Sequence, residues 1–164
     1  MKCWACAVDD FTDFTSTYFS HTKSKMVEFV NSFIKELNGL DIKVQYLRYN
    51  NAGKHIGRLQ ELCADNEITM EFTATNTPQQ NGRVEKKIHT IWQRAMVSMV
   101  LANMNKESKL HFWAEAVAMS DLLENLTLKN CRTTPALEAW AGKKVKKRIG
   151  KLIDFERLGV MNKK

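Results

Sequence analysis

The feature that most constrains the fold is a change of pattern within residues 74–91, which read ATNTPQQNGRVEKKIHTI. The first half of this stretch combines Thr77-Pro78, two glutamines and Asn81-Gly82, and these residue types favour turns and loops. From Val84 onward, apolar residues recur at intervals of three and four, which is the period of an amphipathic helix. The sequence therefore predicts a flexible polar loop followed by a helix that reaches about residue 103.

This pattern places Glu85 in the first turn of the predicted helix, beside Lys86 and Lys87. A carboxylate near a helix N-terminus offsets the partial positive charge there, so a purely structural role is the plain interpretation. The sequence of this segment indicates a second role for Glu85. PQQNGRVEKKIHTI resembles the PQQNG-x-x-E segment of integrase cores from copia-type retrotransposons. In that family the helix carries the last of three metal-binding acids. The resemblance thus implies that Glu85 is a catalytic carboxylate and a metal ligand.

The resemblance extends over about residues 7–144 and has four further parts. The segment WACAVDDFTDFTST resembles the family's VDDFSRYTWVYF hairpin, and LRYNNAG resembles L-R-S/C-D-N-A/G-G. HFWAEAVAMSDLLENL and TPALEAWAGKK resemble FWAEAVNTAVYLLN and TPYEAWTGKK. We therefore expect a partial integrase catalytic core over residues 1–144 and a basic C-terminal extension over residues 145–164.

The fold class that the resemblance implies is α/β, a ribonuclease H-like mixed sheet with helices on both faces. This chain begins at about the family's second strand, so the first, central strand is missing from it. Local patterns predict a hairpin over residues 4–19, helices near 26–37 and 56–63, strands over 42–49 and 68–72, and a helix capped by Ser108. Trp113, Val117 and Leu122 are expected in the core, and Asp9, Asp10 and Asp13 as solvated turn residues.

The metal site implied by the resemblance is incomplete. The family's first catalytic Asp belongs to the missing strand, and Asn50 occupies the position of the second. Two Mg²⁺ or Mn²⁺ ions in such a site need convergent carboxylates, and an amide supplies only one neutral carbonyl oxygen. We therefore expect neither stable metal binding nor strand transfer, although polynucleotidyl transfer remains the family's activity.

Composition and cysteine spacing limit which other binding partners and compartments are expected. The 164 residues are 44% hydrophobic and 26% charged, as in a soluble globular domain, with neither a signal peptide nor a run long enough to span a membrane. Cys3, Cys6, Cys63 and Cys131 lack the second pair that a zinc site needs, so they are interpreted as reduced thiols of an intracellular protein.

The net charge of +7 is concentrated at the C-terminus, where residues 129–164 hold 11 Lys and Arg against 3 Asp and Glu. Five closely spaced cations there are Lys143, Lys144, Lys146, Lys147 and Arg148. They predict phosphate binding or a nuclear-localisation patch, and a solvated charge run is the alternative.

DNA is thus the expected partner, with a homo-oligomer as a second expectation because the missing strand can be borrowed from another copy. The expected DNA contacts outside the basic run are Gln80, Asn81, Gly82, Lys86, Lys87 and His89. Three functions stay open: an active transferase core, a non-enzymatic remnant that retains nucleic-acid or subunit contacts, and a generic RNA-binding domain. The last is disfavoured because no stacking-aromatic RNA motif is visible.

Overall fold

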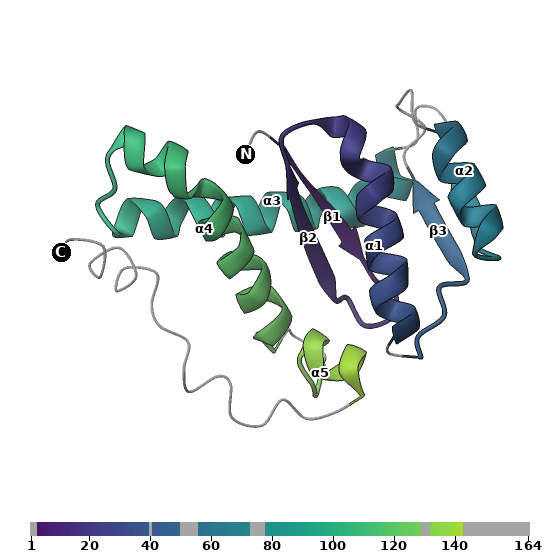
Figure 1. The fold of residues 1–164 in the computed structure, drawn as a ribbon. Helices are drawn as coiled ribbons and strands as arrows, with labels where there is room; N and C mark the ends of the chain where they lie inside the picture. The colour runs from purple at the N-terminus through teal and green to yellow at the C-terminus, as the bar shows by residue number, and fades with distance from the viewer. Residues whose placement is uncertain (1–2, 40, 50–55, 73–77, 129–131, 143–164) are drawn as a thin grey trace. The chain divides into compact units, whose positions relative to one another are not determined.

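The computed structural model of the chain describes residues 3–39, 41–49, 56–72, 78–128 and 132–142 (Figure 1). The described chain forms two compact units. Unit 1 comprises Met1–Ala5 and Tyr18–Arg83, and unit 2 comprises Cys6–Thr17 and Val84–Lys164. The boundary therefore crosses a hairpin near the N-terminus and the first turns of a long helix.

The hairpin consists of strands β1 (Cys3–Val8) and β2 (Thr15–Ser20), as predicted. Its turn is held by Asp9, whose Oδ2 accepts hydrogen bonds from the backbone N and the hydroxyl of Thr12, both at 2.6 Å. Asp13 follows with a φ of 65°, a left-handed conformation that Asp tolerates better than most residues. Asp9 is thus a turn-forming residue, as its sequence context indicated.

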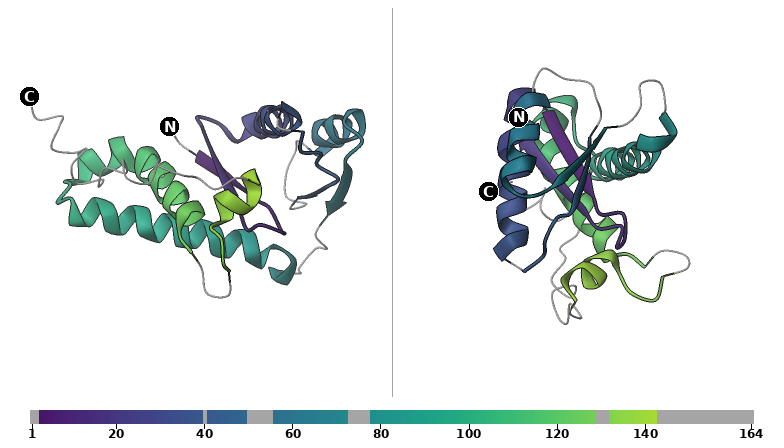
Figure 2. Two further views of the ribbon diagram at one scale, coloured as in Figure 1. Left: turned by 90° about the horizontal axis from the view of Figure 1, so that it is seen from below. Right: turned by 90° about the vertical axis from the view of Figure 1, so that its right-hand side faces the viewer.

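In unit 1, a short 3-10 turn, η1 (Lys23–Lys25), leads into α1 (Met26–Gly39), and α2 (Ile56–Asp65) separates β3 (Tyr46–Tyr49) from β4 (Thr69–Phe72). The two strands are parallel, with Tyr46 paired to Thr69 and Tyr49 to Phe72. Helices α1 and α2 lie side by side on one face of this strand pair (Figure 2). Their buried residues are Phe29, Val30, Ile34, Leu37, Leu59 and Cys63.

The predicted strand over residues 42–49 is shorter in the structure, because only residues 46–49 pair with β4. Residues 42–45 alternate apolar and polar side chains as a strand does, yet most of them have no ladder partner. Gln45 is the exception, since its carbonyl accepts from Thr69 N at 2.9 Å. The alternation over residues 42–49 therefore overestimated the length of the paired strand.

Three helices end in the same hydrogen-bonded turn. After α1, Ile42 N donates to Leu37 O, after α2, Ile68 N donates to Cys63 O, and after α3 (Pro78–Leu101), Met104 N donates to Met99 O. This arrangement is the Schellman motif, which places one residue in the left-handed region, usually glycine. Here the three left-handed residues are Asp41, Glu67 and Asn103, with φ between 50° and 58°. The backbone is consequently strained at Glu67, and less so at Asp41 because Asp tolerates this region better.

Unit 2 is built on α3, α4 (Lys106–Leu126) and α5 (Ala136–Ala141). Asn105, not Ser108, caps α4, since its side chain accepts from Ser108 N. Helices α3 and α4 run side by side, and Trp92 packs edge-on against Trp113 at 6.4 Å (Figure 2). Helix α5 lies against the hairpin turn through Trp140, which stacks on Phe14 at 4.8 Å. Val117 is fully buried as predicted, whereas the prediction for Leu122 is wrong because that side chain is 40% exposed.

The mixed α/β class is confirmed. The described strands form two separate pairs, β1–β2 and β3–β4, and these do not join into one sheet within the described residues. No helix in the described ranges has the length and apolar character that crossing a membrane requires.

Candidate functional site

Helix α3 carries Glu85, and it begins earlier than predicted, at Pro78. Residues 78–82 therefore belong to the helix, and the loop prediction is wrong for them, while residues 74–77 lie outside the described residues. Proline is favoured at the first helical position, where its missing N–H and fixed φ cost nothing, and Gly82 costs only about 1 kcal/mol in a helix interior. Glu85 consequently lies two turns into α3 and not in its first turn, so the helix-terminus explanation for this carboxylate does not hold.

Glu85 is exposed to solvent, and so are Lys86 and His89. Because residues four apart lie on the same face of a helix, Glu85 and His89 are neighbours on the outside of α3. Gly82 is described within the helix, whereas the side chains of Gln80 and Asn81 lie outside what the structure describes. Asn50 and the basic run of Lys143, Lys144, Lys146, Lys147 and Arg148 also fall outside the described residues.

Lys87 has a different environment from its neighbour Lys86. Its residue is only 7% exposed, and its Nζ lies 2.6 Å from Asp13 Oδ2 and 2.9 Å from Glu124 Oε1. Asp13 is a turn residue as expected, but the expectation that it is solvated is wrong, because its side chain is only 13% exposed and its carboxylate pairs with Lys87. The ammonium of Lys87 already has two anionic partners, so in this structure it does not present a free charge to a phosphate.

Glu124 joins the ion pair to a second cation. Arg94 Nη1 lies 2.6 Å from Glu124 Oε2, so each oxygen of this carboxylate meets one positive side chain. We call Asp13, Lys87, Arg94 and Glu124 the Lys87 cluster. It connects the hairpin turn, α3 and α4, three segments of unit 2.

Next to this cluster, α4 contacts the beginning of β2 through polar side chains. Asn125 Oδ1 accepts from Thr15 N at 2.8 Å, and Asn125 Nδ2 donates to Thr15 O at 2.7 Å. Since Phe14 O accepts from Asp9 N across the hairpin, the Thr15 peptide groups point to the opposite edge of β2. Asn125 thus satisfies the outer edge of the sheet at this point, which blocks strand addition there.

Asp121 is, with Glu124, one of the two buried acids of α4. Its carboxylate accepts from the hydroxyls of Thr15 and Thr17. Burial raises the pKa of Asp121, the two threonine hydrogen bonds oppose that rise, and the charge of Glu124 adds to it. Burial also raises the pKa of Cys6 to about 12, with Asp121 contributing in the same direction and Lys87 opposing it.

The sequence contained a signal for the Lys87 cluster. Lys87, Ile91, Ala95 and Met99 recur every four residues, and all four are buried on one stripe of α3. A lysine in register with this apolar row predicts a buried, paired ammonium. Its carboxylate partners were not predictable from spacing, because Glu124 and Asp13 are 37 and 74 residues away in the chain.

The cysteine pair near the N-terminus does not form a ligand set. Cys3 and Cys6 lie three apart on strand β1, and residues at odd spacing point to opposite faces of a strand. In the part of the chain that the structure describes, no three His, Cys, Asp or Glu side chains are grouped so that they could hold a metal ion.

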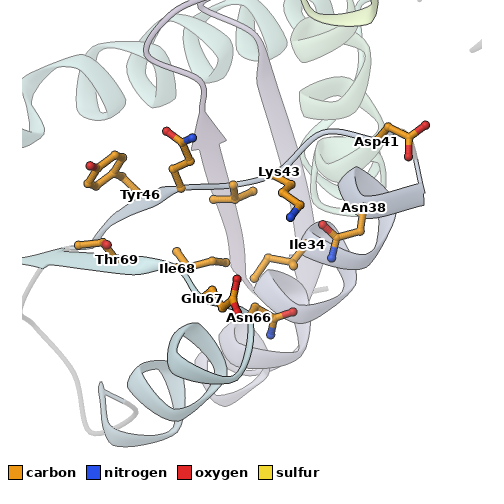
Figure 3. A pocket seen from close by; sticks show the side chains of 11 residues that line it. Ile34, Asn38, Asp41, Lys43, Tyr46, Asn66, Glu67, Ile68 and Thr69 are labelled. Atoms are coloured by element: carbon orange, nitrogen blue, oxygen red, sulfur yellow. The ribbon is translucent and has the colours of Figure 1, made fainter.

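A cavity of about 620 Å³ opens in unit 1, and none of the predicted site residues is among the described residues that line it (Figure 3). It lies where α1 and α2 end, and its lining includes Asp41 and Glu67 of the strained turns together with Lys43. Its walls carry charges of both signs and it is widely open to solvent. Its chemistry therefore indicates no particular ligand.

No protein-family model matches the chain. It is 28% identical over 128 residues to the Retrovirus-related Pol polyprotein from transposon TNT 1-94 of Nicotiana tabacum. That match covers 76% of this chain and 9% of the polyprotein, so the chain spans a small part of its relative.

Three solved structures have a similar fold at low sequence identity. One is the simian T-cell lymphotropic virus intasome in complex with PP2A regulatory subunit B56 gamma, with a TM-score of 0.63 and 14% identity over 82% of this chain and 46% of that chain. A second is the catalytic core domain of BIV integrase, with a TM-score of 0.60 and 16% identity over 85% of both chains.

The third is the HTLV-2 integrase catalytic core domain in complex with magnesium, in its dimeric form. Its TM-score is 0.56 at 15% identity, over 80% of this chain and 79% of that chain. At these identities the likeness shows the fold alone, and the fold of this chain is similar to that of integrase catalytic core domains.

Proposed function

We propose that this integrase-core-like chain, which is related to a retrotransposon Pol polyprotein, binds DNA without catalysing strand transfer. The observation that carries the proposal is the environment of Glu85. This carboxylate is exposed on α3, and among the described residues it belongs to no group of three His, Cys, Asp or Glu side chains that could hold a metal ion. The position that the copia-type pattern fills with Asp is Asn50 in this chain.

The residues present do not fit a two-metal site. Two divalent ions that stabilise an attacking and a leaving oxygen need several anionic ligands, and Mg²⁺ demands near-octahedral oxygen coordination. Glu85 supplies one anionic group and Asn50 supplies a neutral oxygen. Magnesium, which accompanies the HTLV-2 core, therefore has no corresponding ligand cluster in the residues that the structure describes.

The proposed DNA contacts fall into two groups. Lys86 and His89 are exposed on α3, with Gln80, Asn81 and Gly82 at the start of the same helix. The larger positive charge belongs to the run of Lys143, Lys144, Lys146, Lys147 and Arg148. Lys87 is left out of the proposed contacts because its charge is balanced by Asp13 and Glu124.

The separation of the strands into two pairs supports a further part of the proposal. In the resembled family a central strand continues the sheet, and two-stranded sheets are marginal alone. We propose that an extended strand from another copy of the chain adds to one of the two strand pairs. Since Asn125 blocks the edge of β2 at Thr15, we propose that this added strand pairs with one of the other strand edges.

DNA binding is tested by salt titration with a random duplex. Three proteins are compared: the wild type, Lys86→Ala, and a variant with Gln at Lys143, Lys144, Lys146, Lys147, Arg148 and Lys151. If all six tail cations contact phosphates, the slope of log K against log salt should fall by about 5 in the tail variant and by about 0.9 in Lys86→Ala. Equal slopes for the wild type and the tail variant would mean that the run is solvated and that the charge argument is wrong.

The lack of strand transfer is tested separately with a labelled duplex in Mg²⁺ or Mn²⁺. We expect no metal-dependent cleavage or joining by the wild type, and no change in Glu85→Gln. Cleavage that Glu85→Gln abolishes would establish an active transferase and overturn the proposal, whatever the salt titration shows.

A further inference from the structure

Helix α3 has apolar side chains around much of its circumference. Ile91, Ala95 and Met99 are buried, but Ile88, Trp92, Val97, Val100 and Leu101 are 37–63% exposed. Rotating the helix about its axis would exchange one apolar set for another, so apolar packing alone selects its orientation weakly. A more directional interaction is needed to decide which face points outward.

The Lys87 cluster has the required direction. Lys87 is the first member of the buried row with Ile91, Ala95 and Met99, and its ammonium meets Asp13 and Glu124 at 2.6 and 2.9 Å. An ammonium cannot be buried favourably without such partners, and both carboxylates are also largely buried, with side chains 13% and 5% exposed. Only one rotation of α3 brings Lys87 to both partners while Arg94 reaches the other oxygen of Glu124.

The same rotation determines which side chains of α3 are exposed to solvent. Residues two apart on a helix lie on nearly opposite sides, so burial of Lys87 directs Glu85 and His89 away from α4, and both are exposed. We propose that Lys87 is a positioning residue, which through Asp13 and Glu124 fixes the rotation of α3 and so presents Glu85, Lys86 and His89 to the ligand of this face. The DNA-binding role of the exposed face of α3 rests on the proposed function, whereas the control of helix rotation by Lys87 does not.

Buried ion pairs often stabilise a fold no better than apolar side chains of equal size, although removing one partner is strongly destabilising. Orientation and stability can therefore be separated. The test uses Lys87→Met, the double variant Lys87→Met/Glu124→Met, and Lys86→Met as the matched exposed control. Each is measured by thermal denaturation, by near-UV circular dichroism, which reports the Trp92–Trp113 pair, and by the salt slope of binding to a random duplex.

For Lys87→Met we expect a loss of about 10 °C in Tm, an altered near-UV spectrum, and a salt slope lower by up to about 0.9, because a rotated α3 no longer presents Lys86 to phosphate. The double variant should regain most of the Tm while its near-UV spectrum stays altered. Lys86→Met should keep the Tm and spectrum and lose about 0.9 of slope. Lys87→Arg, which keeps the charge, should retain the wild-type spectrum and serves as the folded comparison if Lys87→Met does not fold.

Three results would overturn the inference. One is a fall of about 0.9 in the salt slope of Lys87→Met with Tm and spectrum unchanged, since Lys87 would then be a phosphate contact. Another is a double variant with a wild-type spectrum, since the cluster would then not orient α3, and the third is a Lys87→Arg spectrum like that of the double variant. If the wild type binds no DNA at all, the proposed function fails, but the spectra and Tm values still decide the role of Lys87.

Discussion

Units 1 and 2 bury side chains of different chemistry. The buried residues of unit 1 are all apolar or cysteine: Phe29, Val30, Ile34, Leu37, Leu59, Cys63 and Ile68. All the buried polar and charged side chains in the described ranges belong to unit 2: Thr12, Thr15, Lys87, Ser120, Asp121, Glu124 and Asn125. The apolar part of the unit 2 core consists largely of alanine and a few larger residues.

This difference indicates two ways of specifying a structure. In unit 1, the ring of Phe29 stacks on Tyr18 at 4.8 Å and on Phe33 at 5.9 Å between ring centroids. These aromatic residues and their aliphatic neighbours remove a large apolar area from water. In unit 2, small apolar residues supply less area, and polar contacts with strict geometry determine how α4 meets α3 and the hairpin. Substitutions of buried residues should therefore change the free energy of unfolding by different mechanisms in the two units.

The largest effect is expected at Glu124, in unit 2. Glu124→Gln removes the negative charge shared by Lys87 and Arg94 and leaves the buried ammonium with Asp13 alone. We expect a loss of about 4 kcal/mol in the free energy of unfolding, measured by urea denaturation. Glu115→Gln, at an exposed position of α4, should stay within about 0.5 kcal/mol of wild type. If Glu115→Gln lost as much stability as Glu124→Gln, the effect at Glu124 could not be assigned to the Lys87 cluster.

A similar but slightly smaller effect is expected at Leu59, in unit 1. Leu59→Ala deletes three buried carbon atoms from a side chain that is 1% exposed and should cost about 3 kcal/mol. Because no charge is involved, the loss should be the same at pH 5 and pH 8, and the exposed Gln60→Ala serves as control. A loss that varied strongly with pH would contradict the apolar description of unit 1.

Asp121 provides a pH-dependent comparison within unit 2. Its pKa is raised in the folded state, so it contributes stability that is complete below its unfolded pKa of about 4 and is lost as the pH rises through the folded value. Asp121→Asn removes this titration. The Tm of the variant minus that of wild type should therefore increase between pH 4 and pH 8, and a difference that decreases over this range would show that the carboxylate is stabilised in its charged form.

The smallest effect is a gain in unit 1. Asp41 and Glu67 occupy left-handed positions where glycine has no steric penalty, so Asp41→Gly and Glu67→Gly should each stabilise by about 0.5–1 kcal/mol. Glu67→Ala is the control, because alanine retains the strain and should give no gain. Equal Tm values for the glycine and alanine variants would mean that the strain is negligible.

Much of the secondary structure could be predicted from local pattern. Turn residues and apolar periodicity predicted the hairpin, the helix over residues 26–39 and the strand β4. The predicted bounds of these elements agree with the observed bounds to within a few residues. The start of α3 could not, because Asn81-Gly82 favours a turn locally, while the helix containing it gains from packing along its whole buried row. The N-cap of α4 is Asn105 and not the predicted Ser108 for a related reason. Both residue types are good caps, and only the geometry distinguishes them.

The candidate site shows the same division most clearly in two adjacent lysines. The sequence by itself determined that Glu85, Lys86 and Lys87 share one helix, and helical periodicity then requires that they point in different directions. Only the tertiary structure decided that Lys87 is a buried partner of Asp13 and Glu124 and that Lys86 is exposed. The physical reason is that the free energy of a charge depends on its surroundings, and those surroundings are supplied by segments far away in the chain.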